Sequence, residues 1–137
     1  MKSYYTLNFI NEYKYDNKSL SKEKLTKELV SKYKKDIKGL SHVRLNSDCF
    51  GFIYFDNDNL VGYINIEKKD KETWIQALEV NKEYQGKGYG KYLLKECESN
   101  GAKYLSVNKK NEKAINLYKS NGWKVYKETD TMYFMKK

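Results

Sequence analysis

Three glycines at alternate positions, Gly86, Gly88 and Gly90, constrain this chain more than any other feature. An apolar run at 74–80 precedes them, and apolar residues at helical spacing follow: Tyr89, Leu93, Leu94 and Cys97. The pattern predicts a strand, a tight turn and a helix, which is most of a β-α-β unit. Such a turn suits an anion, because glycine lets the backbone approach closely and the first N–H groups of the helix are unpaired.

The glycine spacing disfavours two common nucleotide-binding loops. It is too tight for a Walker A loop, and no Gly-Lys-Ser/Thr follows. It also differs from the GxGxxG of dinucleotide folds, and no further β-α-β units follow. The alternative is a turn whose glycines serve only packing.

Apolar periodicity predicts the element order β-α-β-β-β-α-β-α-β-β. The expected strands are 2–10, 50–55, 60–67, 74–80, 104–107, 123–127 and 132–135. The expected helices are 21–38, one that opens in the glycine turn and ends at Asn100-Gly101, and one capped by Asn111 and closed by Gly122. Residues 56–59 read as a hairpin turn, and residues 40–48 are ambiguous. This order predicts a mixed sheet with helices on both faces.

The chain of 137 residues has room for one domain. Its first ten residues do not resemble a signal peptide, and no apolar run approaches the ~20 residues of a membrane span. We therefore expect a cytoplasmic protein without a membrane partner. Cys49, Cys97 and His42 share no metal-ligand spacing, so we expect two reduced thiols and no metal.

The formal net charge of +9 raises the possibility of nucleic-acid binding. Against it, Arg44 is the only Arg among the 27 basic residues, and Arg is the residue that grips phosphates and bases bidentately. The Lys residues are also spread along the whole chain. A general positive field still favours capture of a polyanionic ligand.

Two segments resemble the signature motifs of the GNAT (GCN5-related N-acetyltransferase) superfamily. The first is Leu78-Glu79-Val80 followed by Gln85-Gly86-Lys87-Gly88-Tyr89-Gly90; the second runs from Asn111 through Ala114 and Leu117-Tyr118 to Gly122-Trp123. The resemblance implies an α/β fold: a mostly antiparallel sheet of six to seven strands flanked by helices, splayed between the strands near 74–80 and 104–107. It implies one domain over 1–137, with an acetyl-coenzyme A half at about 61–123 and an acceptor half at about 1–60.

The resemblance also implies how acetyl-coenzyme A binds. Backbone amides of the glycine turn would hold the pyrophosphate, helped by the charge of Lys91; the turn residues are Gln85, Gly86, Lys87, Gly88, Tyr89 and Gly90. Backbone groups of Leu78 and Val80 would bond the pantetheine arm like an added strand, and the Val80 N–H would polarise the thioester carbonyl. Asn111 would contact the arm, or serve only as a helix cap. One departure is Lys82, where many relatives have Pro.

We expect two catalytic residues, Tyr118 from the resemblance and Glu79 from its position in the strand, where a structural or solvent-exposed role is the alternative. Tyr118 would protonate the departing thiolate, the alternative being a core tyrosine. An ammonium substrate must lose a proton before attack, and Glu79, in an otherwise apolar strand, is our candidate base. Glu72 is the other candidate, while the strand at 105–107 offers none.

The sequence therefore predicts an N-acetyltransferase in which a primary amine attacks acetyl-coenzyme A directly in a ternary complex. The alternatives are an acetyl-coenzyme A-binding module without turnover and a Lys-rich nucleic-acid-binding domain. The positive charge slows encounter with polycations, which favours a small monoamine or a peptide or protein amine. We expect a monomer or a homodimer.

Overall fold

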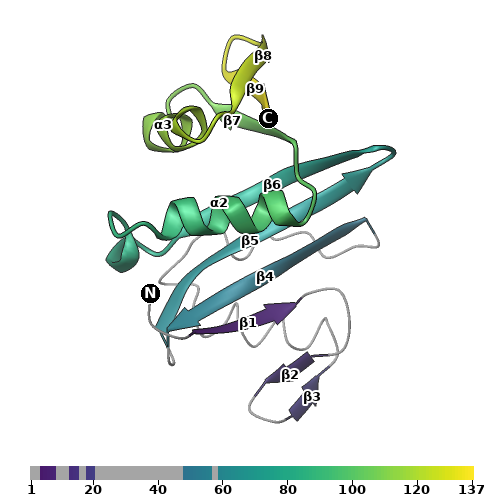
Figure 1. Cartoon of the computed structure of the whole chain (residues 1–137), viewed down its shortest axis with the longest axis vertical. Coiled ribbons are helices and arrows are strands. Elements are labelled where there is room, and N and C mark those ends of the chain that lie inside the picture. Colours follow the sequence, from purple (N-terminus) through teal and green to yellow (C-terminus); the bar gives the residue numbers. More distant parts are fainter. Residues whose placement is uncertain (1–3, 9–12, 16–17, 21–47, 57–58) are drawn as a thin grey trace.

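The computed structural model describes residues 4–8, 13–15, 18–20, 48–56 and 59–137 (Figure 1). Seven strands form one sheet in the order β1-β4-β5-β6-β7-β9-β8. The strands are β1 Tyr4–Asn8, β4 Cys49–Asp56, β5 Asn59–Lys69, β6 Glu72–Val80, β7 Tyr104–Asn108, β8 Lys124–Glu128 and β9 Met132–Lys136. All neighbours in this sheet are antiparallel except β6 and β7, which are parallel. The predicted mixed, mostly antiparallel sheet is confirmed.

The strand boundaries differ from the sequence expectations by a few residues. β6 begins at Glu72, two residues before the expected start at 74, so only Asp70 and Lys71 separate it from β5. Asp70 has φ +51°, a left-handed conformation that Asp tolerates better than most residues. The hairpin expected at 56–59 is confirmed, because Asp56 pairs with Asn59.

Two short strands, β2 Tyr13–Tyr15 and β3 Lys18–Leu20, form a separate antiparallel pair. We did not predict them, because three residues are too few to reveal a period of two. The helix predicted over 21–38 lies outside the described residues. The prediction of helices on both faces therefore stays a prediction.

Strand β5 is the centre of the structure. Residues 60–67 are all buried, so both faces of this strand are covered. Two of them are polar: Asn65 and Glu67 are only 1% and 5% exposed. A continuous buried run of this kind places polar groups where they need partners inside the protein.

Helices α2 Tyr89–Ser99 and α3 Glu112–Ser120 follow β6 and β7. In Figure 1, α2 lies across β5 and β6. Its buried residues are Leu93, Leu94 and Cys97, three of the four predicted. Both helices end before a left-handed glycine, Gly101 or Gly122, as expected. No helix among the described residues combines the length and the apolarity that a bilayer crossing needs.

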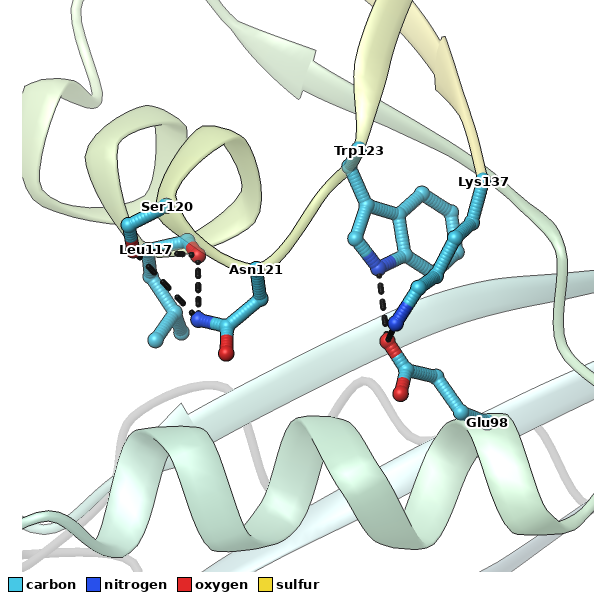
Figure 2. A network of polar contacts seen from close by, with 6 residues as sticks. All are labelled: Glu98, Leu117, Ser120, Asn121, Trp123 and Lys137. Carbon is cyan, nitrogen blue, oxygen red and sulfur yellow. Dashed lines mark hydrogen bonds and ion pairs between the residues drawn. The ribbon is translucent and has the colours of Figure 1, made fainter.

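A polar network joins the ends of the two helices to the carboxyl end of the chain (Figure 2). The Trp123 indole donates to Glu98 Oε1 at 2.9 Å, and Lys137 Nζ lies 2.8 Å from the same oxygen. At the end of α3, Asn121 donates to the Leu117 carbonyl at 2.7 Å. The shared carboxylate therefore fixes the start of β8 and the end of β9 against α2.

Candidate active site

The parallel pair β6 and β7 separates along its length. Only Trp74 and Ile75 of β6 pair with β7, opposite Tyr104 and Leu105. Beyond them a cleft of about 360 Å³ opens between the strands. Its lining residues are Tyr63, Ile75, Gln76, Ala77, Leu78, Glu79, Leu105, Ser106, Val107, Asn108, Asn111 and Tyr118. The predicted splay is confirmed.

The hydrogen-bond register of β6 decides which backbone groups face this cleft. Asn81 N–H donates to the Val61 carbonyl at 2.7 Å, so those two residues form a hydrogen-bonded pair. Because such pairs alternate along an antiparallel ladder, Glu79 opposite Tyr63 is also bonded to β5. Leu78 and Val80 therefore direct their N–H and C=O groups away from β5, towards the gap, where the sequence analysis expects a pantetheine arm.

A one-residue bulge lies at the closed end of the cleft. Asn65 pairs with Ala77 and Ile66 with Ile75, which leaves Gln76 as the extra residue of β6. A bulge increases the local twist of a strand and redirects its side chains. It lies one residue beyond the point where β6 stops pairing with β7.

The glycine turn follows β6 along the chain and begins α2. Gly86 and Gly88 have φ +75° and +89°, and Gly88 is the N-cap residue. A Cβ at either glycine would find no heavy atom within 4 Å, so the turn borders open space. No side chain of the described residues caps α2, and the N–H groups of Tyr89, Gly90 and Lys91 precede the first complete helical turn. These are the features that the sequence analysis expects of an anion site.

The other residues of this turn differ in their roles. The Gln85 N–H donates to the Lys82 carbonyl at 3.3 Å, and its side chain donates to the Val80 carbonyl at 3.0 Å. Its amide is thus already bonded, whereas we expected it to hold a phosphate. Gly90 allows close packing instead, because a Cβ there would lie 3.4 Å from Leu117. Lys87 Nζ lies 5.7 Å from the Tyr84 ring.

Tyr89 and Lys91 begin α2. Tyr89 is half-buried and its ring packs edge-on against Tyr84 at 5.5 Å. Lys91 is exposed, so its charge is available beside the helix start. The Tyr89 side chain therefore packs against the protein, and the group that Tyr89 offers to a phosphate is its backbone N–H at the start of α2.

Asn111 and Tyr118 bring α3 to the cleft. Asn111 Oδ1 accepts from the Ala114 N–H at 3.2 Å, so the residue caps α3 and also lines the cleft. Tyr118 is 7% exposed, and its hydroxyl makes no hydrogen bond within the described part of the chain. Burial, and then the neighbouring Cys97, raise the pKa of Tyr118 to about 12. At neutral pH it is a phenol with a proton to donate.

Glu79 lies beside Tyr63, its register partner on β5, and both line the cleft. The Tyr63 hydroxyl donates to Glu79 Oε2 at 3.0 Å. Burial and the Glu79 charge raise the pKa of Tyr63 far above its ordinary value, so Tyr63 stays a donor. The structure thus places our candidate base in the cleft. Glu72 instead accepts from the Trp74 indole at 3.0 Å, at the far end of β6.

A second cavity, of about 720 Å³, adjoins the first. Its lining residues are Lys69, Asp70, Lys71, Glu72, Trp74, Gln76, Ser106 and Phe134. Of the described lining residues, only Gln76 and Ser106 belong to both cavities. Sequence reasoning missed Gln76 and the buried Glu67 beside it, because a polar residue in a strand has the same pattern whether it faces water or a cleft.

Cysteine and metal chemistry find little support in the described residues. Cys49 and Cys97 are both buried, and burial raises the pKa of the Cys97 thiol far above its ordinary value. A thiol of this kind is a poor nucleophile. No three His, Cys, Asp or Glu side chains of residues 48–56 and 59–137 come together as metal ligands.

Comparison with known proteins agrees with this geometry. The sequence profile of the acetyltransferase (GNAT) family matches residues 10–123, and the chain belongs to that family. A probable spermine N(1)-acetyltransferase of Bacillus subtilis subsp. natto (strain BEST195) is 31% identical over 93 residues. That match covers 57% of this chain and 60% of the relative's length.

Solved structures show the same fold. The PaiA N-acetyltransferase of Thermoplasma acidophilum, in complex with coenzyme A, matches with a TM-score of 0.58 and 24% identity over 86% of this chain and 79% of that one. The Campylobacter jejuni N-acetyltransferase PseH, in complex with acetyl coenzyme A, matches with a TM-score of 0.60 and 20% identity over 97% and 96% of the two chains.

Proposed function

We propose that this protein transfers the acetyl group of acetyl-coenzyme A directly to a primary amine within a ternary complex. One observation carries the proposal: a cleft opens between β6 and β7, Leu78 and Val80 direct backbone groups away from β5 on this side of β6, and the glycine turn that begins α2 follows β6 along the chain. Family membership and the named ligands of two structural neighbours support it.

The residues of the cleft fit this cosubstrate. Its pyrophosphate is an anion, and the start of α2 at Gly88 offers unpaired N–H groups beside open space. Its pantetheine arm carries amide groups, and Leu78 and Val80 direct complementary backbone groups away from β5, on a stretch of β6 that does not pair with β7. Gln85 contributes differently from our expectation, because its side-chain amide donates a hydrogen bond to the Val80 carbonyl.

Groups of the protein would then act on the thioester carbonyl and on the pantetheine arm. The Val80 N–H donates to the thioester carbonyl oxygen, where negative charge develops during attack. Asn111 holds the arm and caps α3 at once. Bound acetyl-coenzyme A supplies the acetyl group and a thiolate leaving group.

Two side chains would act on protons during the reaction, the Glu79 carboxylate and the Tyr118 hydroxyl. Glu79 Oε1 or Oε2 takes one proton from the ammonium form of the substrate, which frees the nitrogen lone pair for the new C–N bond. As the C–S bond breaks, the Tyr118 hydroxyl donates a hydrogen bond to the departing sulfur, and the second proton that the nitrogen loses on forming the amide neutralises the thiolate. With a pKa of about 12, against ~8.5 for a thiol, Tyr118 stabilises the developing thiolate chiefly as a hydrogen-bond donor.

The amine acceptor is the open part of the proposal. The net charge of +9 disfavours a polycation, whereas one relative is named a probable spermine acetyltransferase. A small panel separates these: spermine, the monoamine tyramine, and a short peptide with a free N-terminal alanine. Each is incubated with acetyl-coenzyme A, and free thiol and the mass of the product are measured.

The panel distinguishes the proposal from its alternatives. Acetylated product with equal thiol release supports direct N-acetylation. Calorimetric binding of acetyl-coenzyme A without any product would favour a binding module. Absence of binding, with steeply salt-dependent binding of DNA or RNA, would favour the nucleic-acid alternative.

A further inference from the structure

Glu67 is a carboxylate buried in the central strand, and the proposed chemistry does not use it. It is 5% exposed and lies opposite Trp74 of β6. Its Oε1 accepts from Gln76 Nε2 at 3.0 Å and pairs with Lys69 Nζ at 3.1 Å. Its Oε2 lies 3.4 Å from the Cys49 thiol. A buried charge with this many contacts holds its neighbours in fixed orientations.

The contact with Glu67 determines which way the Gln76 amide points. A carboxylate only accepts hydrogen bonds, so the NH₂ group of Gln76 must face it. The amide oxygen, Gln76 Oε1, is thereby turned away from Glu67. No described residue donates a hydrogen bond to it. The side chain thus presents one oriented acceptor atom.

Gln76, the residue that carries this acceptor, borders two cavities. It is the bulged residue of β6 and lines both the cleft and the larger cavity. Glu79, the proposed base, lines the same cleft, so an amine that Glu79 deprotonates would lie in a cavity that both side chains border.

We propose that Gln76 is an acceptor-binding residue whose amide oxygen accepts an N–H of the attacking amine, and that Glu67 is the residue that positions it. The inference rests on the proposed acetyl transfer. A hydrogen bond through one N–H leaves the lone pair free to face the thioester. The nitrogen gains positive charge as it attacks, so this bond strengthens in the transition state.

The test replaces Gln76 with methionine, which keeps the side chain's length and removes its hydrogen bonds. We expect kcat/KM for the amine to fall roughly 10-fold or more, as for a lost bond to a charged group, with the affinity for acetyl-coenzyme A within a factor of about two. Asn116→Met is the matched control, since Asn116 is exposed on α3. The probe is each amine of the panel that the wild-type protein acetylates. Unchanged kcat/KM in Gln76→Met overturns the inference.

A double-mutant cycle tests the positioning role of Glu67. Glu67→Gln lets the Gln76 amide turn either way, so kcat/KM for the amine should fall several-fold. If Glu67 acts only through Gln76, the double variant Glu67→Gln/Gln76→Met is no slower than Gln76→Met alone. Additive losses would show that Glu67 acts on its own, which contradicts the positioning role. Product from no amine, despite bound acetyl-coenzyme A, rejects the proposed function and this inference with it.

Discussion

The Tyr63 hydroxyl donates a 3.0 Å hydrogen bond to Glu79 Oε2, across the β5–β6 ladder. Neighbouring strands put the two side chains on one face of the sheet, and the cleft reaches both. Glu79 is thereby held by one oxygen, while its carboxylate remains in the cleft. The pair joins the central strand to the edge where the proposed chemistry takes place.

Glu79→Gln tests the proposed base. The variant keeps the shape of the side chain and its contact with Tyr63, but it cannot take a proton. We expect the rate near pH 7 to fall roughly 10²-fold or more and to recover partly as the pH rises, because more amine then arrives neutral. The measurement is the pH–rate profile against the wild type. Profiles that overlay would remove Glu79 from the mechanism and leave Glu72 or a water relay.

Tyr63→Phe tests whether the hydrogen bond matters for orientation. The change deletes the hydroxyl of a buried ring and with it the hydrogen bond to Glu79. Loss of one hydrogen bond costs about 1 kcal/mol, so we expect kcat to be roughly fivefold lower. Acetyl-coenzyme A affinity should not change, because the contact concerns only Glu79. In the background of Glu79→Gln the same change should have little further effect on kcat, and an equal loss in both backgrounds would contradict this role.

Tyr118→Phe should keep the fold and the affinity for acetyl-coenzyme A while it lowers kcat about 10²-fold or more. In the wild type, a pKa of about 12 keeps the phenol protonated, so Tyr118 should produce no alkaline fall in rate below about pH 11. Steady-state kinetics from pH 6 to 10 check both statements. Turnover within a factor of about two of the wild type would make Tyr118 a packing residue.

Alkaline stability offers an independent check on the burial of Tyr118. The pKa of Tyr118 rises from 10.0 to about 12 on folding. The protonated hydroxyl therefore contributes fully to the free energy of unfolding below pH 10, and this contribution is lost as the pH rises through about 12. Two pKa units correspond to roughly 3 kcal/mol. Urea unfolding of the wild type and Tyr118→Phe at pH 9 and near pH 12 should show their stability difference shift by about this amount. A constant difference would mean that the hydroxyl is solvated.

The proposed anion site at the glycine turn can be tested with two side chains of the same shape, of which only one is charged. Gly88 has φ +89°, which Asn and Asp tolerate better than other residues, and its Cβ would point into open space. Gly88→Asp places a negative charge where the pyrophosphate is proposed to bind, so acetyl-coenzyme A affinity should fall roughly 10²-fold. Gly88→Asn carries the same backbone strain without the charge and should bind far better. Calorimetry that finds equal affinity in a folded Gly88→Asp variant and the wild type would refute the anion site.

Local sequence determined the elements that carry the proposed anion site. Gly86 and Gly88 adopt positive φ because a tight strand-to-helix turn requires it, and Asn111 caps α3 through its own side chain. Both effects involve residues within a few positions of one another. The turn and both described helices were therefore predictable from spacing, whereas the splay of the strands was implied by the family resemblance.

Only the tertiary structure decided what surrounds the cleft. Register between β5 and β6 brought Tyr63 to Glu79, and the bulge brought Gln76 to Glu67, across separations of 16 and 9 residues. No local pattern encodes such contacts, because they depend on strand pairing. The sequence by itself thus determined the turn that is proposed to bind an anion and the helix that begins there. Strand register decided which polar side chains meet at the proposed reacting end, since a shift of one residue would turn each to the opposite face.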